Sequence, residues 1–504
     1  MLRSLIRNVA ISAVAFFAIS VVGLLLVPVL IRHYGIAGFG YISVARLFFP
    51  TTTLSLFDFG FGETATQAVA RARTDADWSR CGRILGLVAA LAASTGMVVG
   101  IALAVVSPWL GTWLSVALPK QAAFQHLMWT TAALMPLLFM SLTLEGVIKG
   151  FERYVALRSL EVFTALLYAA MVLAAVGLSF DATAVCYAFL TTQSLRAMLA
   201  AALAVKWLRS EQVRLSRAQP EDIRDFVAMS RLMAANKVLG TAQAQLSPVL
   251  IGFFFGPTGL GIYDALSRLP RAAKAVLGLL SSTVLPLASK LESAADAAGL
   301  RRLGHAGVLL IGMVSLPPLA ATMTFSEPLL RLWVGSELSR FHTWQAAMFM
   351  VPALSVLLSF GGTALLVRPA VVATMNRLTI LQIALHFALA WLAAGALQER
   401  AFILGQVVAV AVTFVPQLRL VCGELGIHPR VYGQLARLVT LLVALALLAL
   451  WWVPALVGWL PLVAAMGSWT LVAWVASFFL VLPATYRNKV TGAVKQFLPH
   501  RGFR

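Results

Sequence analysis

Apolar stretches of about twenty residues follow one another along almost the entire chain, separated by short polar segments. Each stretch is long enough for an α-helix to cross a bilayer, which takes about 20 predominantly apolar residues. Of the 504 residues, 60% are hydrophobic and only 12% are charged, whereas soluble domains carry about 25% charged residues. The sequence therefore predicts an all-α membrane protein with no room for a large soluble domain.

We expect about fourteen transmembrane helices. Arg3 and Arg7 precede the first apolar stretch, as in a signal peptide. However, the stretch is longer than the apolar core of a signal peptide, which has about 7–15 residues. We therefore predict that it is not cleaved and forms the first span. The predicted spans are roughly 9–31, 38–59, 84–107, 124–148, 159–178, 183–205, 227–255, 259–287, 305–325, 342–366, 370–394, 401–421, 435–456 and 460–483.

The basic residues alternate between the two sides of the predicted membrane. With the N-terminus inside, the cytoplasmic segments and their flanking helix ends hold 28 Lys and Arg, and the opposite side holds 5. Such a bias marks the cytoplasmic side. It predicts that both termini are cytoplasmic, and it explains most of the net charge of +20 without a nucleic-acid partner.

One charged stretch, "YDALSRLPRAAKA" (263–275), lies between apolar segments. If the stretch 259–287 did not span the membrane, every later loop would lie on the opposite side. The 13 basic residues of the later cytoplasmic segments would then lie outside the cell. The positive-inside bias therefore places this stretch within the membrane, in the eighth predicted helix. Pro270 is expected to bend or break that helix, because proline lacks the backbone N–H.

An internal repeat relates the two halves of the chain. The segment "SPVLIGFFFGPTGLGIYDALSR" (247–268) matches "VPVLIRHYGIAGFGYISVAR" (27–46) in its Pro-Val-Leu-Ile, its Gly-x-Gly, its tyrosine and its arginine. A repeat of six spans predicts two six-helix lobes related by a pseudo-twofold axis along the membrane normal, with two further helices at the C-terminus. The predicted parts are an N-terminal lobe (1–205), a basic cytoplasmic linker (206–226), a C-terminal lobe (227–421), two additional helices (435–483) and a basic tail (484–504).

Several cations fall inside predicted spans, where a charge costs at least about 2.5–3.5 kcal/mol. On the eighth helix they lie within an arc of about 120°, and the repeat pairs Arg268 with Arg46 of the second helix. The alternative is that they are structural charges, since Asp264 and Arg268 are four residues apart and can pair. The pattern favours a cationic central cavity that binds an anion such as a phosphate, lined by Arg46, Arg268, Arg271, Lys274, Lys237 and Arg196.

Four acidic residues also fall in or beside the spans, and they are candidates for ion coupling or for structural pairing: Asp58, Glu145, Glu161 and Asp264. The sequence contains no nucleotide-binding loop, paired-histidine metal motif or nucleophile elbow. The three cysteines lie far apart and fit neither a disulfide framework nor a metal site. We therefore predict no catalytic residue, no metal and no cofactor.

The opening of the chain resembles the polysaccharide transporters of the multidrug/oligosaccharidyl-lipid/polysaccharide (MOP) exporter superfamily, the Wzx-type flippases of lipid-linked oligosaccharides such as O-antigen. The resemblance is carried over the first 85 residues by Gly38-x-Gly40-Tyr41, by Asp58-x-Gly60-x-Gly62 and by Ala70-Arg71 before a basic loop. The sequence departs from the family at Ile36-Ala37, where Pro-Glu is common.

The resemblance implies alternating access through a central cavity lined by helices 1, 2, 7 and 8. It implies transport of undecaprenyl-pyrophosphate-linked oligosaccharide across a bacterial inner membrane, amid membrane lipids, with a polysaccharide polymerase and a chain-length regulator as candidate partners. The alternatives are a drug or cation exporter of the same fold, for which an acidic cavity is expected, and a membrane-embedded glycan polymerase, for which a long outside loop is expected.

The topology predicts that residues 71–83, 206–226 and 484–504 are cytoplasmic. Single cysteines placed there in a Cys-less background should resist an impermeant thiol reagent added outside, and they should react after the membrane is opened. Labelling of 206–226 from outside would overturn the count of spans that precede it.

Overall fold

The structure is a computed structural model, and it describes residues 2–281, 291, 296–365, 368–451, 453, 456–483 and 487. Within these ranges the regular elements are helices and there is no strand. Twelve of the described helices are long and apolar enough to cross a membrane. The predicted all-α membrane fold is confirmed.

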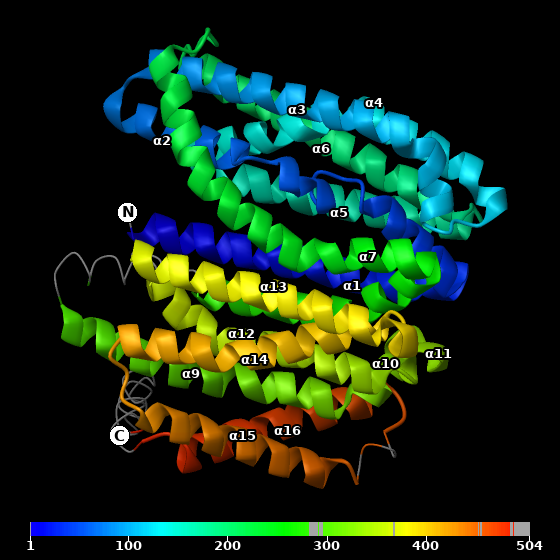
Figure 1. Ribbon diagram of the computed structural model, residues 1–504, viewed down its shortest axis with the longest axis vertical. Helices are drawn as coiled ribbons and strands as arrows, with labels where there is room; N and C mark the ends of the chain where they lie inside the picture. The colour runs from blue at the N-terminus through cyan, green and yellow to red at the C-terminus, as the bar shows by residue number, and fades with distance from the viewer. Residues whose placement is uncertain are drawn as a thin grey trace, which may run out of the picture. The chain divides into compact units, whose positions relative to one another are not determined.

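The first half of the chain forms one series of helices (Figure 1). They are α1 (Leu2–Arg46), the short 3₁₀ helix η1 (Thr53–Phe57), α2 (Phe61–Asp75), α3 (Trp78–Trp113), α4 (Leu118–Gly150), α5 (Tyr154–Gly177), α6 (Ala182–Ser210) and α7 (Pro220–Ser281).

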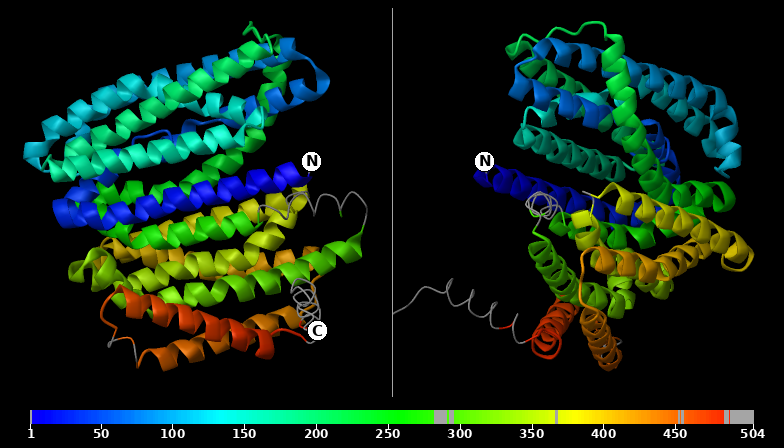
Figure 2. Two further views of the ribbon diagram at one scale, coloured as in Figure 1. Left: turned by 180° about the vertical axis from the view of Figure 1, so that it is seen from behind. Right: turned by 60° about the vertical axis from the view of Figure 1, so that its left-hand side comes forward.

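The second half continues with α9 (Ala297–Thr324), α10 (Ser326–Val334), α11 (Ser336–Ser339), α12 (His342–Ala364), α13 (Pro369–Leu397), α14 (Arg400–Glu424), α15 (Arg430–Ala449) and α16 (Trp459–Leu480). The last two helices run beside each other and both contact α9 (Figure 2).

Two long helices each combine two predicted spans, which explains why twelve candidates correspond to fourteen predicted segments. α1 contains one non-helical residue, Gly35, at φ 69° and ψ 177°, and α7 contains one, Gly256, at φ 65° and ψ −165°. Positive φ favours glycine because it has no Cβ. These glycines occupy equivalent positions in the repeat, three residues before Gly38 and Gly259. The break in α7 therefore lies at Gly256, and the helix continues through Pro270, where we expected a bend or break.

The second predicted span (38–59) is not one continuous helix. α1 ends at Arg46, and irregular backbone with η1 leads to α2. In a continuous helix the carbonyl of residue 46 would accept from the N–H of residue 50, but Pro50 has none. The hydroxyl of Thr52 instead donates to the Arg46 carbonyl at 2.7 Å. The proline and this hydroxyl end the helix directly after Arg46.

The repeat-equivalent segments that follow the two kinks contact each other. A Cβ on Gly40 would overlap the carbonyl oxygen of Pro257, and a Cβ on Gly261 would lie 2.6 Å from the Ile36 carbonyl oxygen. The Ser43 hydroxyl donates to the Asp264 carboxylate at 2.9 Å, and both residues are buried. Glycine at these positions lets the two backbones approach closely.

The segment between α6 and α7 packs along α3. A Cβ on Gly82 would overlap the Arg214 carbonyl oxygen, and one on Gly86 would lie 2.8 Å from the Ser216 carbonyl oxygen. Asp222 anchors the end of this segment, since Arg83 donates to its carboxylate at 2.8 Å. Burial raises the pKa of Asp222, but the backbone N–H of Gln219 and the guanidinium of Arg83 outweigh it and hold this pKa below its usual value.

The chain forms two compact units. The first comprises 1–268 with 387–402, and the second comprises 269–386 with 403–504. In the first unit, α3, α4 and α6 run side by side, as Figures 1 and 2 both show. In the second, α9 packs against α12, α15 and α16. The predicted lobe boundaries follow the repeat instead, and they stay a prediction.

Replacing Gly40 with alanine should lower the stability of the protein by about 1–3 kcal/mol, the usual cost of overpacking, because the new methyl group overlaps Pro257. Gly395→Ala is the matched control, since a Cβ there meets nothing within 4 Å. Thermal unfolding of the purified variants in detergent measures the difference. Equal stability of the two variants would contradict the close packing of the two segments.

Candidate functional site

A cavity of about 220 Å³ lies within the first unit, among α1, α5 and α6. The side from α1 is aliphatic, and the sides from α5 and α6 are polar and aromatic. Arg46, at the end of α1, and Arg268 of α7 also line it. The full lining consists of Ile19, Val22, Gly23, Leu26, Val27, Leu30, Arg46, Glu161, Thr164, Ala165, Tyr168, Phe189, Thr192, Gln193, Arg196 and Arg268.

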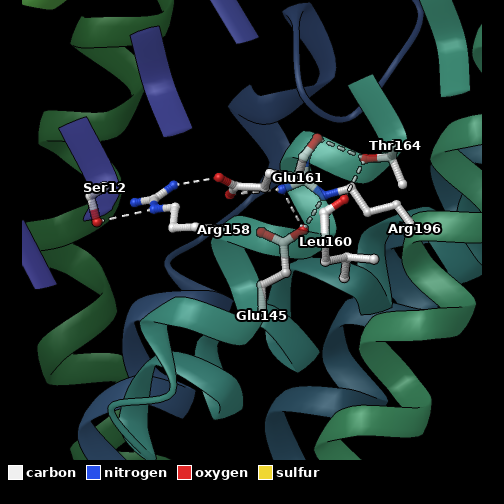
Figure 3. A network of polar contacts seen from close by, with 7 residues as sticks. All are labelled: Ser12, Glu145, Arg158, Leu160, Glu161, Thr164 and Arg196. Atoms are coloured by element: carbon white, nitrogen blue, oxygen red, sulfur yellow. Dashed lines mark hydrogen bonds and ion pairs between the residues drawn. The ribbon is translucent and has the colours of Figure 1, made fainter. Parts of the chain in front are cut away.

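Arg196 belongs to a balanced network of ion pairs beside this cavity (Figure 3). Its guanidinium lies 2.8 Å from the Glu145 carboxylate and 3.3 Å from that of Glu161. Arg158 donates to Glu161 at 2.6 Å and to the Ser12 hydroxyl at 3.2 Å. Two arginines thus meet two glutamates, and the network adds no net charge to the cavity.

Arg268 is also paired. Its guanidinium donates twice to one carboxylate oxygen of Asp264, at 2.8 and 3.2 Å. The same oxygen accepts from Ser43, so this carboxylate serves both the arginine and the contact between the repeat segments. The pair is spaced i,i+4 on α7, as the sequence predicted for a structural pair.

Arg46 is held differently. Its guanidinium carbon lies 4.3 Å from the centre of the Phe189 ring and 5.8 Å from that of Tyr168. Aromatic faces attract cations, by about 0.5–2 kcal/mol. Within the part of the chain that the structure describes, no carboxylate forms an ion pair with Arg46. It is the excess cation of the cavity.

The charges around the cavity can be counted. Among the described residues, four arginines face three carboxylates, which leaves a net charge of +1: Arg46, Arg158, Arg196 and Arg268 against Glu145, Glu161 and Asp264. The cavity therefore suits a ligand with modest negative charge, and it opposes a cation.

The other predicted residues do not all reach this cavity. Arg271 and Lys274 lie on α7 in the second unit and are exposed. Asp58 is buried, and its carboxylate accepts from the backbone N–H groups of Gly60 and Phe61 at 3.2 and 3.0 Å, so it caps α2. The side chain of Lys237 lies outside the described residues.

The aromatic and uncharged polar residues of the cavity were not predicted from the sequence. Those of α6 are Phe189, Thr192 and Gln193, which precede Arg196 at spacings that put all four on one face. On α5, Glu161, Thr164 and Tyr168 share the same spacing. A polar stripe within an apolar helix was the signal that could have found them. Among the described residues, no group of His, Cys, Asp or Glu could hold a metal ion.

Comparison with protein families decides where this chain belongs. Residues 5–292, more than half of the chain, match the model of the family described as "Polysaccharide biosynthesis protein". The chain belongs to this family. The resemblance read from the first 85 residues is thereby confirmed. A comparison with curated protein sequences gave no significant match.

Solved structures show that the fold is that of the MOP superfamily. The lipid II flippase MurJ in an inward closed conformation matches with a TM-score of 0.70 at 11% identity, over 95% of this chain and 99% of MurJ. An inward-facing multidrug resistance MATE transporter of the MOP superfamily matches with a TM-score of 0.68 at 13% identity, over 82% of this chain and 98% of that one. The MATE transporter VcmN of Vibrio cholerae matches with a TM-score of 0.55 at 14% identity, over 85% and 98% of the two chains.

Removing Arg196 should destabilise the protein on the order of 3 kcal/mol, because two largely buried carboxylates lose their shared partner. Arg196→Met should therefore unfold at a lower temperature in detergent than the wild type. Adding Glu145→Gln and Glu161→Gln to it should restore part of the loss, since the repulsion between the two acids disappears. A single variant as stable as the wild type would show that the network is not structural.

Proposed function

We propose that this protein moves an anionic, polyprenyl-pyrophosphate-linked oligosaccharide across the bacterial inner membrane, with both termini in the cytoplasm, for the synthesis of a cell-surface polysaccharide such as O-antigen, capsule or exopolysaccharide. The protein acts by alternating access and is not an enzyme. Membership in the polysaccharide biosynthesis family and the MOP fold support transport as the general activity. The undecaprenyl carrier, the glycan polymerase and the chain-length regulator are part of the proposal.

The main support for the proposal is that Arg46 lines the cavity without a carboxylate partner among the described residues. Its guanidinium lies against aromatic faces. A phosphate can therefore bind it without first displacing an acid. A guanidinium also matches a phosphate with two parallel hydrogen bonds, which an ammonium cannot form.

Arg268 has a second role in the proposal. Arg268 lines the same cavity but is paired with Asp264. When Arg268 binds the phosphate, its ion pair with Asp264 is weakened. Arg271, Lys274 and Lys237 stay predicted ligands on the grounds of the sequence. Glu145 and Glu161 act first as partners of Arg196, and their part in ion coupling, like that of Asp58 and Asp264, stays a prediction.

The alternative of a drug or cation exporter is supported by the MATE-like fold. The charges of the cavity disfavour this alternative, because the described residues around the cavity carry a net charge of +1, which repels a cation. A cation as cargo would require an additional acid that the described residues do not supply at this cavity.

Changing Arg46 to alanine should abolish transport while leaving the protein folded, because the change strands no carboxylate. Arg46→Lys should retain part of the activity, since the charge survives but the planar fork does not. Arg73→Ala is the control, an exposed arginine outside the cavity. The measurement is the lipid-linked glycan that accumulates in the cytoplasmic leaflet when each variant replaces the wild type in the source organism.

The Arg46 variants should accumulate this glycan, and the control should not. Asp264→Ala with Arg268→Ala separates ligand binding from pairing, because it removes both members of that pair at once. Unchanged export by the Arg46, Arg268 and Arg271 triple alanine variant would refute the proposed role of these cations and leave a transporter of another cargo.

A further inference from the structure

We infer that the cavity between α1, α5 and α6 is a saccharide subsite, which receives the sugar ring nearest the pyrophosphate of the lipid carrier. This inference rests on the proposed function and assigns a second recognition element to it. The pyrophosphate is bound at the arginine end of the cavity, by Arg46 with Arg268, and the sugar occupies the remainder.

The polar groups of the cavity require a ligand that both donates and accepts hydrogen bonds. The buried hydroxyl of Tyr168 has no hydrogen-bond partner. The side-chain amide of Gln193 lines the same cavity and is half-buried, and an amide carries both donors and an acceptor. Buried polar groups are normally paired, and leaving one unpaired costs about 1–3 kcal/mol. The Tyr168 hydroxyl therefore indicates a polar ligand, and Gln193 is placed to contact it.

Two other ligands fit the cavity less well. A polyprenyl or acyl chain would match the aliphatic side from α1 but would leave the buried Tyr168 hydroxyl without a partner. A pyrophosphate filling the cavity would offer acceptors only, and it would approach the Glu161 carboxylate, while the charges of the described residues around the cavity sum to only +1.

A sugar ring fits both faces of the cavity. Its hydroxyl groups donate and accept, as the amide and the phenol require, and its C–H face can pack on Val22, Leu26 and Val27 of α1. The cavity, of about 220 Å³, is large enough for one sugar ring beside the arginines. The subsite is therefore placed to contact the sugar residue next to the pyrophosphate.

Three substitutions probe the subsite without removing a charge. Tyr168→Phe deletes only the unpaired hydroxyl, and Gln193→Leu replaces the amide with a side chain of similar size. Gly23→Leu fills the cavity, and a Cβ at Gly23 meets nothing within 4 Å, so the helix tolerates it. Tyr187→Phe, on α6 but outside the lining, is the matched control.

The experiment measures binding to the full-length protein in lipid nanodiscs by the change in tryptophan fluorescence. The probes are undecaprenyl pyrophosphate alone and the same carrier bearing one glucose, galactose, N-acetylglucosamine or N-acetylgalactosamine. At least one sugar-bearing probe should bind the wild type more tightly than the bare carrier. Tyr168→Phe and Gln193→Leu should each reduce that preference by roughly three- to tenfold, the effect of one lost hydrogen bond to a neutral group, and Gly23→Leu should abolish it. In all three variants, binding of the bare carrier should weaken less than binding of the sugar-bearing probe.

The outcomes separate this inference from the proposed function. If no sugar improves binding to the wild type, or if the three variants weaken the bare carrier as much as the sugar-bearing probe, the cavity is not a saccharide subsite. In either case Arg46→Ala still tests the proposed function by itself, because it should weaken every probe, bare carrier included. If the wild type binds none of the five probes, both the saccharide subsite and the proposed function are wrong.

Discussion

The cost of placing a charge in hydrocarbon governs the polar interior of this protein. Each buried ion must be paired or held by aromatic faces, since isolated charges in a membrane cost several kcal/mol. Arg158, Arg196 and Arg268 are paired with carboxylates. Arg46 lies against Phe189 and Tyr168 instead. Arg46 can therefore bind a ligand without loss of an ion pair, whereas each of the three paired arginines would lose one, and the proposed function depends on this difference.

The sequence predicted much of the fold because the signals were long and repeated. Apolar stretches predicted the helices, and the repeat placed the Gly-x-Gly segments in equivalent positions. It could not predict that a single non-helical residue, Gly35 or Gly256, separates the two helical segments within α1 and within α7, because a glycine in a longer turn and a glycine in a kink look alike in sequence. The effect of Pro50 also depended on its surroundings, since Thr52 was present to satisfy the freed carbonyl. At Pro270 the helix continues.

The candidate site was predictable only in its charges. A cation in an apolar helix stands out, so Arg46, Arg196 and Arg268 were found, and the spacing of four residues also indicated the pair of Arg268 with Asp264. The partners of Arg196 lie much further along the chain, 51 residues away for Glu145 and 35 for Glu161. Pairing over such separations follows from packing, and no local spacing encodes it. Tyr168 and Phe189 were missed because aromatic residues in membrane helices also serve as interface anchors.

The Asp264 carboxylate joins binding to packing in a way that neither the repeat nor the charges reveal alone. One of its oxygens accepts from Arg268 on its own helix and from Ser43 of the repeat-equivalent segment. The same two segments are in backbone contact at Gly40 and Gly261. An anion that draws Arg268 away removes two hydrogen bonds from this carboxylate, to which the Ser43 hydroxyl also donates. A ligand at the arginine end of the cavity therefore acts on the contact between the two segments without touching it, because a single buried carboxylate serves both.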